Sequence, residues 1–172
     1  MIIVSFYCDI DGKTFYSDCS KKLKANCDRI GVESIVVEKN YGTNWIDNVR
    51  AKPIFIKEML QKLRKPLICL DVDCEICNLD FEIEGNWGFT LRSDQMPCDF
   101  VHYVDYNHDN LIFIDRWIAE IGRCGKGSHA ALQNIYSSLN YFFIPEGHFN
   151  LHLVETESKS QYFRDKWKSY TK

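Results

Sequence analysis

The chain has 172 residues, of which 45% are hydrophobic and 26% are charged, and its formal net charge is -3. This length and apolar content suffice for one buried core and argue against two full domains. Because the charge balance is slightly acidic, the chain provides no basic field that would attract nucleic-acid phosphates, and general nucleic-acid binding is not expected. No apolar run reaches the length of a membrane span.

The N-terminus carries no recognisable targeting segment. Met1 leads directly into Ile2, Ile3 and Val4, without a charged leader followed by a long apolar stretch. We therefore expect a complete, cytoplasmic protein.

Eight cysteines are scattered through apparent strands and helices. A chain of this size folds without disulfide staples, so we expect reduced thiols that pack as small hydrophobic side chains. Cys74 and Cys77 form a C-x-x-C pair, but no second pair completes a tetrahedral zinc site.

The first half of the chain alternates strand and helix patterns. Strands are expected at residues 2–8, 34–37 and 67–70, and helices at residues 16–30 and from Pro53 to about residue 63. Gly31 supplies the stop of the first helix, and Pro53 suits the first turn of the second. The strand at 67–70 is wholly apolar and ends abruptly in acidic residues, which is typical of a central strand covered on both faces.

The second half is less regular. Short strands are expected at residues 81–83, 88–92 and 99–104, between turn residues. Two helices follow, one with apolar positions from Leu111 to Ile121 and one beginning near Ser128. A last strand is expected around residues 142–144, and residues 158–172 form a basic, aromatic tail.

The turn Asp71-Val72-Asp73 stands where the most apolar strand ends. Ligands of open α/β sheets bind at the carboxyl ends of the strands, so this position favours function. Residues two apart in an extended segment lie on the same side, so both carboxylates can converge on one hard cation while Val72 faces the core. The alternative is a purely structural role, in which one aspartate caps a turn and the other is solvated.

An apolar strand followed by Asp-x-Asp also resembles the haloacid-dehalogenase-type phosphatases, in which the first aspartate is the nucleophile. In that family the motif stands near the chain start, with Thr or Val two residues after the second aspartate. Here the motif lies mid-chain and Glu75 occupies that position. These departures make the phosphatase a less favoured alternative.

A broader resemblance surrounds the acidic turn. Residues 52–73 read KPIFIKEMLQKLRKPLICLDVD, which is similar to the core of small nucleotide-diphospho-sugar transferases of the GT-A glycosyltransferase fold. Those proteins have a Lys-Pro helix before an apolar strand that ends in Asp-x-Asp. Segments at 15–31, 112–117, 131–132 and 144–150 resemble the family's first helix, its helix ending in Trp, its later Ala-Leu helix and its Pro-aromatic-Asn corner.

The resemblance implies an α/β fold with a mixed, Rossmann-like central sheet, helices on both faces and one compact domain over residues 1–172. Residues 1–80 would form the nucleotide-binding half, and residues 81–157 the half for donor sugar and acceptor. The implied function is a metal-dependent glycosyltransferase that moves a sugar from a nucleotide-diphosphate-sugar, with a UDP-sugar favoured, to an unknown hydroxyl acceptor. The alternative within this fold is a nucleotide-sugar-binding protein without catalysis.

The family's metal roles carry over to the acidic turn. Asp73 would bind Mn²⁺ or Mg²⁺ directly, and Asp71 would contact the ribose or reach the metal through a water. In related enzymes a C-terminal histidine completes the metal shell. His152 is our candidate, with His148 beside it, although both precede the position at which that histidine is expected.

The resemblance also implies donor contacts. Ser5, Phe6 and Tyr7 stand at the strand end where the family holds base and ribose, and either aromatic ring could stack on a base or simply pack in the core. Lys52 is the candidate for a phosphate contact, against the alternative of a solvated lysine at a helix start. Arg50 is a second choice.

The catalytic candidates are His129 and Asp94. Ser128-His129 replaces the Asp-Gln that the family often has at the start of its Ala-Leu helix, so His129 would serve as a hydrogen-bond partner or base on the acceptor side. Arg92, Asp94 and Asp99 fall where the family recognises the sugar. The chain is short for such a protein, so acceptor access could depend on a partner or a homodimer.

Overall fold

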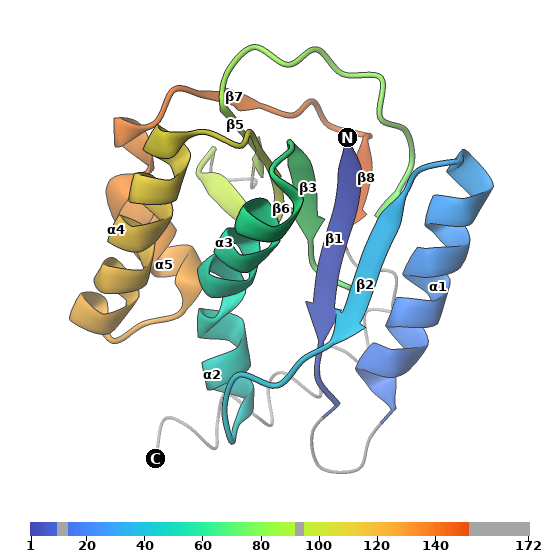
Figure 1. The fold of residues 1–172 in the computed structure, drawn as a ribbon, viewed down its shortest axis with the longest axis horizontal. Coiled ribbons are helices and arrows are strands. Elements are labelled where there is room, and N and C mark those ends of the chain that lie inside the picture. Colours follow the sequence, from blue (N-terminus) through green and yellow to red (C-terminus); the bar gives the residue numbers. More distant parts are fainter. Residues whose placement is uncertain (10–13, 92–94, 152–172) are drawn as a thin grey trace.

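The computed structural model describes residues 1–9, 14–91 and 95–151, and its centre is a six-stranded sheet (Figure 1). In spatial order the strands are β2 (Ser34–Glu38), β1 (Ile2–Tyr7), β3 (Leu67–Leu70), β6 (Pro97–Val104), β5 (Trp87–Leu91) and β7 (Tyr141–Phe143). The helices are α1 (Phe15–Ile30), α2 (Trp45–Arg50), α3 (Lys52–Leu63), α4 (His108–Cys124) and α5 (Ser128–Ile135), with a 3-10 turn at Tyr136–Ser138.

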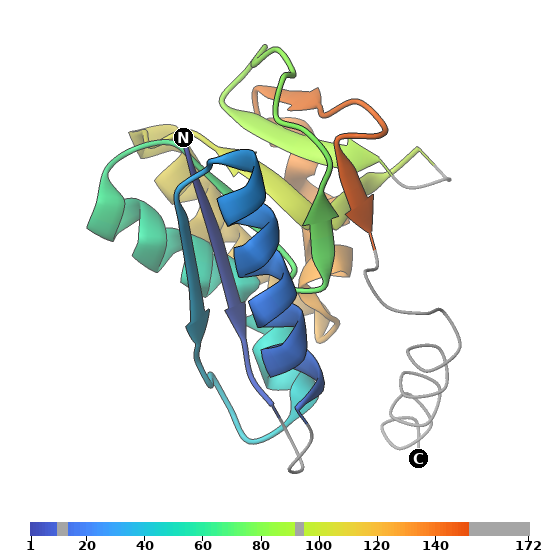
Figure 2. The ribbon, with the colours of Figure 1, turned by 90° about the vertical axis from the view of Figure 1, so that its right-hand side faces the viewer.

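Helices cover both faces of this sheet (Figures 1 and 2). On one face, α3, α4 and α5 pack over a core that contains Trp87 and Trp117. On the other face, α1 contributes Cys19, Leu23 and Cys27 to a second core. A compact domain with a mixed sheet and helices on both faces confirms the predicted fold class. The division at residues 80 and 81 stays a prediction, and the tail at 158–172 lies outside the described residues.

The first half folds as its sequence pattern predicts. β1 pairs in parallel with β2 and β3, so the opening is β-α-β-α-β with the short α2 added before α3. Gly31 ends α1 with φ of 73°, a left-handed conformation that glycine adopts without steric cost. All four residues of β3 are buried, as expected of a central strand. The carboxyl ends of these three strands therefore meet at one edge.

The direction of the strands changes in the second half. β6 runs antiparallel to both β3 and β5, and β7 is parallel to β5. The start of β6 consequently lies beside the end of β3, where the Asp71 N–H donates to the Phe100 carbonyl at 2.9 Å. This pairing brings Asp99 to the same sheet edge as the acidic turn.

A small second sheet was not predicted. β4 (Cys74–Ile76) pairs antiparallel with β8 (Phe149–Leu151), directly after the acidic turn. Asn26, buried on α1, donates to the Ile76 carbonyl at 3.0 Å and accepts from the Ile76 N–H at 2.7 Å. These contacts fix the position of β4, which follows Asp73 directly in the chain.

The prediction of a strand at residues 81–83 is wrong, because residues 77–86 form no strand. A strand needs a backbone partner. Phe81 is held instead by side-chain contacts, with ring centroids 6.3 Å from both Phe142 and Phe149. Its apolar character therefore reflects packing over the second core.

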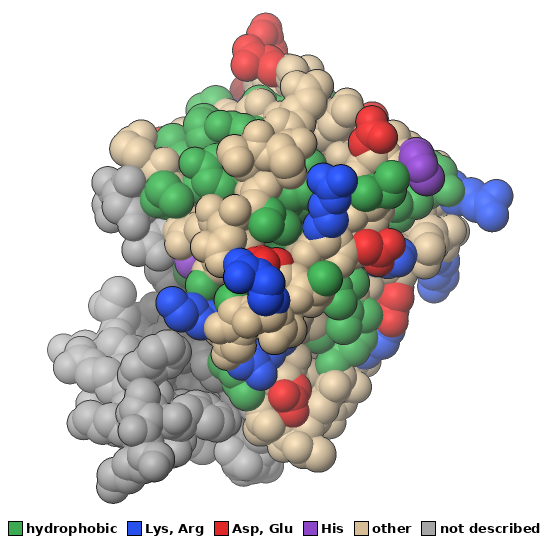
Figure 3. Space-filling view, turned by 90° about the vertical axis from the view of Figure 1, so that its left-hand side faces the viewer, with side chains coloured by type: hydrophobic (Ala, Val, Ile, Leu, Met, Phe, Trp, Pro, Cys, Tyr) green, Lys and Arg blue, Asp and Glu red, His purple; other side chains and the backbone are tan. Residues whose placement is uncertain are grey.

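Three further findings concern the whole described chain. No helix within the described ranges has the length and apolar character needed to cross a bilayer. The eight cysteines all lie among the described residues and form no disulfide there. On the face shown in Figure 3, basic side chains are dispersed among acidic and apolar ones rather than gathered in one patch.

We predict that Asn26→Ala lowers the free energy of unfolding by about 2 kcal/mol, because two buried backbone groups of Ile76 lose their partner. Urea denaturation measures the change. Asn78→Ala, at an exposed position after β4, is the control. A loss below about 0.5 kcal/mol for Asn26→Ala would show that the contact does not anchor β4.

Candidate functional site

The acidic turn adopts a tight geometry at the end of β3. The Cys74 N–H donates to the Asp71 carbonyl at 3.0 Å, and Val72 is buried in the second core, as predicted. Asp73 is also buried, with 7% of its surface exposed. The side chain of Asp71 is 30% exposed, so it can reach a bound ligand.

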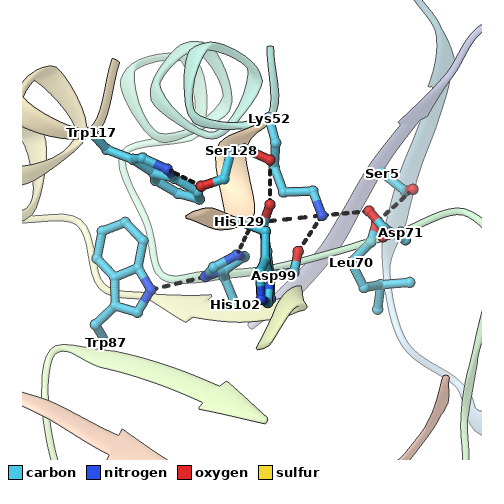
Figure 4. A network of polar contacts seen from close by, with 10 residues as sticks. All are labelled: Ser5, Lys52, Leu70, Asp71, Trp87, Asp99, His102, Trp117, Ser128 and His129. Carbon is cyan, nitrogen blue, oxygen red and sulfur yellow. Dashed lines mark hydrogen bonds and ion pairs between the residues drawn. The ribbon is translucent and has the colours of Figure 1, made fainter. Parts of the chain in front are cut away.

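Lys52, the first residue of α3, points its ammonium into this turn (Figure 4). Its Nζ lies 2.5 Å from Asp71 Oδ1 and 3.8 Å from Asp99 Oδ1, and it donates to the Asp99 carbonyl. Lys52 is buried, which excludes the alternative of a solvated lysine at a helix start. Although burial lowers the pKa of Lys52, the Asp71 and Asp99 carboxylates outweigh this effect and raise it.

Asp99 is the centre of the network in Figure 4. Its Oδ1 accepts from His102 Nε2 at 2.8 Å, and its Oδ2 accepts from the Ser128 hydroxyl at the start of α5. Burial raises the pKa of Asp99, but the Lys52 charge and the hydrogen bonds from His102 and Ser128 outweigh it and leave the pKa low. Asp99 is therefore a charged carboxylate whose hydrogen-bond donors come from β6 and α5 and whose counter-charge comes from α3.

Two tryptophans hold the outer partners of Asp99. Trp87 Nε1 donates to His102 Nδ1 at 3.1 Å, so the neutral imidazole carries its proton on Nε2 and donates it to Asp99. Trp117 Nε1 donates to the Ser128 carbonyl at 2.8 Å. Burial lowers the pKa of His102, with the Asp99 carboxylate opposing, so His102 is neutral near pH 7. His102 therefore has a structural role, as a donor to Asp99.

Asp71 differs from Asp99 in its balance of charge. Burial raises the pKa of Asp71 to about 6, with the Lys52 ammonium opposing the increase and the Asp73 carboxylate adding to it. Two neighbouring carboxylates thus share a region in which Lys52 supplies one positive charge. Lys52 therefore offsets the negative charge of this turn only in part.

His129 stands half-buried on the first turn of α5. Its Nδ1 accepts from the Asp99 backbone N–H at 3.3 Å, and its Nε2 lies 3.0 Å from Gln133 Nε2. Both ring nitrogens of His129 therefore have a partner within the protein. Its role toward an acceptor, as hydrogen-bond partner or base, stays a prediction.

The three residues at the end of β1 lie differently from one another. Ser5 is fully buried and its hydroxyl donates to the Leu70 carbonyl at 2.8 Å, which ties β1 to β3 (Figure 4). The Phe6 ring packs against Tyr41 and Phe55, with centroids 5.3 and 4.8 Å away. Tyr7 is half-buried on the opposite face, beside α1. Their nucleotide contacts stay predictions.

Several predicted residues do not join this constellation. Arg92, Asp94 and His152 lie outside the described residues. Arg50 donates to the carbonyls of Gly125 and Lys126 and so holds the loop between α4 and α5.

The donor set of the acidic turn can supply part of the coordination shell of a divalent cation. No group of three or more His, Cys, Asp or Glu side chains that could hold a metal occurs within the described part of the chain. Mg²⁺ sites in phosphate-binding proteins commonly take one or two carboxylates and complete their shell with substrate phosphates and waters. Asp71 and Asp73 match that partial set, whereas a site made of protein ligands alone would need more.

No family model matches the sequence, and a search of curated proteins finds no match either. Among solved structures, the fold is similar to that of a glycosyltransferase involved in the glycosylation of the major capsid of PBCV-1. The TM-score is 0.65, and the match covers 95% of this chain and 98% of that one, at 10% sequence identity. The chain has a glycosyltransferase-like fold. At this identity the likeness concerns the fold alone.

Sequence reasoning named Lys52, Asp71 and His129 but missed the arrangement around Asp99. An aspartate inside a largely apolar strand is a signal that a buried charge has a partner. The identity of its partners depends on the alignment of β6 with β3 and α5, which local patterns do not contain.

We predict that neutral His102 makes stability pH-dependent. The pKa of His102 is lower in the folded protein than the unfolded value of 6.5, so the unfolded chain binds the additional proton. Stability is complete above the unfolded pKa and is lost as the pH falls through it, by up to about 1.4 kcal/mol per pH unit.

Unfolding free energies of the wild type and His102→Gln between about pH 7.5 and about pH 5.5 test this prediction. The opposite effect of Asp71 is common to both proteins and cancels in the difference. The wild type should lose stability relative to the variant as the pH falls, and parallel pH curves would contradict a buried neutral His102.

Proposed function

We propose that this protein is a metal-dependent glycosyltransferase that moves a sugar from a nucleotide-diphosphate-sugar, with a UDP-sugar favoured, to a hydroxyl acceptor. One observation carries the proposal. At one edge of a sheet with a glycosyltransferase-like fold, the Asp71-Val72-Asp73 turn lies with a buried lysine and with the start of α5.

The acidic turn is the proposed cation site. Asp71 and Asp73 would hold Mn²⁺ or Mg²⁺ together with oxygens of the donor diphosphate, and His152 is the proposed further ligand. A bound cation of this kind stabilises the negative charge of a departing diphosphate, which is worth several kcal/mol in such sites. Lys52 supplies a second positive charge at the same edge, because its ammonium touches Asp71.

The start of α5 is the proposed place of sugar and acceptor. His129 lies there, with its Nδ1 bonded to the Asp99 backbone N–H and its Nε2 close to the Gln133 amide. We assign it the role of a hydrogen-bond partner of the acceptor hydroxyl. Asp94 remains the proposed acidic catalytic residue, and the donor base and ribose are proposed to lie at the end of β1, near Ser5, Phe6 and Tyr7.

We predict that nucleotide-diphosphate-sugars stabilise the protein only when Mn²⁺ is present. A panel of uridine, guanosine and cytidine diphosphate-sugars, with and without Mn²⁺, should raise the melting temperature of the wild type, most for a uridine donor, because the ligand binds the folded state. Asp73→Asn should abolish the shift. Asp80→Asn, which removes an equivalent charge from a side chain that is 82% exposed, should keep it.

Donor hydrolysis or transfer then separates an enzyme from a protein that only binds the donor. An enzyme turns the stabilising donor over with Mn²⁺, and His129→Ala lowers the rate by about tenfold or more, the equivalent of one hydrogen bond to the substrate. Stabilisation without turnover would favour the binding protein. If no donor in the panel stabilises the protein, the proposed binding of a nucleotide-diphosphate-sugar is wrong.

A further inference from the structure

One ammonium group serves two carboxylates at this site. Lys52 Nζ contacts Asp71 Oδ1 at 2.5 Å, and it also donates to the Asp99 carbonyl and lies 3.8 Å from Asp99 Oδ1. The side chains of Lys52 and Asp99 are 9% and 6% exposed, whereas that of Asp71 is 30% exposed. The accessible end of the network is therefore the oxygen pair of Asp71.

The two carboxylates hold the ammonium in different ways. Asp99 is fixed by His102 and Ser128, which are themselves held by tryptophan N–H groups. Asp71 is fixed by the backbone of its turn, and its side chain pairs with Lys52. If the contact to Asp71 breaks, Lys52 keeps the Asp99 carbonyl as an acceptor and the Asp99 carboxylate as a counter-charge.

A divalent cation that approaches Asp71 meets this ammonium at the same carboxylate. The two positive charges repel each other strongly at such short range in a partly buried site. A donor diphosphate adds negative charge to the same region and offsets that repulsion. Binding of the cation alone is thus opposed, whereas binding of the cation with a diphosphate is not.

We propose that Lys52 is a displaceable counter-cation of Asp71, which makes tight binding of the divalent cation conditional on the donor diphosphate. This inference rests on the proposed function, because it concerns the same cation site. It assigns to Lys52 a role in the order of binding: the ammonium satisfies Asp71 in the free protein and passes to Asp99 when cation and diphosphate arrive together.

The test measures Mn²⁺ binding without nucleotide, from the electron paramagnetic resonance signal of free Mn²⁺ during titration. Lys52→Gln is expected to bind Mn²⁺ at least about tenfold more tightly than the wild type, because the competing charge is gone. Asp99→Asn is expected to bind Mn²⁺ more weakly, because the ammonium loses the carboxylate that would hold it once it leaves Asp71. Lys57→Gln, which removes a surface ion pair with Asp115 from the same helix, is the matched control and should match the wild type.

The same titrations with uridine diphosphate complete the test. Added diphosphate should tighten Mn²⁺ binding to the wild type by a larger factor than it does for Lys52→Gln. Unchanged or weaker donor-free binding by Lys52→Gln would overturn the inference. If that variant does not fold, Asp99→Asn decides, and donor-free binding equal to the wild type would then overturn it.

The outcomes also separate this inference from the proposed function. If the wild type with diphosphate binds no Mn²⁺, or if Asp73→Asn binds it equally well, the cation site itself is refuted. If the wild type binds Mn²⁺ through Asp73 but the Lys52 variant changes nothing, the site stands and the conditional role of Lys52 falls.

Discussion

A buried ammonium shared by two carboxylates organises the sheet edge that carries the acidic turn. Lys52 comes from α3, Asp71 from the end of β3 and Asp99 from β6, so one ion-pair network fixes three elements relative to one another. Loss of one partner of a buried ion pair typically costs about 3–5 kcal/mol, because an uncompensated charge is left behind. The same network therefore holds the fold together and places charge where a ligand can reach it.

The network has a fixed side and an accessible side. Asp99 has a lowered pKa because Lys52, His102 and Ser128 all favour its charged form against burial. Asp71, which burial leaves with a pKa raised to about 6, is less well compensated. This asymmetry places the less fully compensated carboxylate at the acidic turn, at the sheet edge where His129 is held by the backbone of Asp99. Under the proposed function, a diphosphate with its cation would complement this distribution better than a free anion would.

The sequence predicted the parts of the structure that local patterns determine. The apolar run at 67–70, Gly31 at a helix end and Pro53 in a first turn each gave the correct element, because burial and backbone conformation leave a local signature. It did not predict β4 and β8, whose paired residues Cys74 and Leu151 lie far apart in the chain. Nor did it predict the donors to Asp99, since these depend on how β6 aligns with its neighbours. Likewise, Lys52 was expected at a phosphate, and its ion pair with Asp71 appears only once α3 is packed against the sheet.

The most direct measurement is anomalous diffraction at the manganese edge from crystals grown with Mn²⁺ and uridine diphosphate. Our account predicts a peak within coordinating distance of the Asp73 carboxylate and of the diphosphate, with Lys52 Nζ moved off Asp71 Oδ1 and retained by Asp99. A structure in which Lys52 still pairs with Asp71, with no manganese at the turn while the nucleotide is bound, would contradict it.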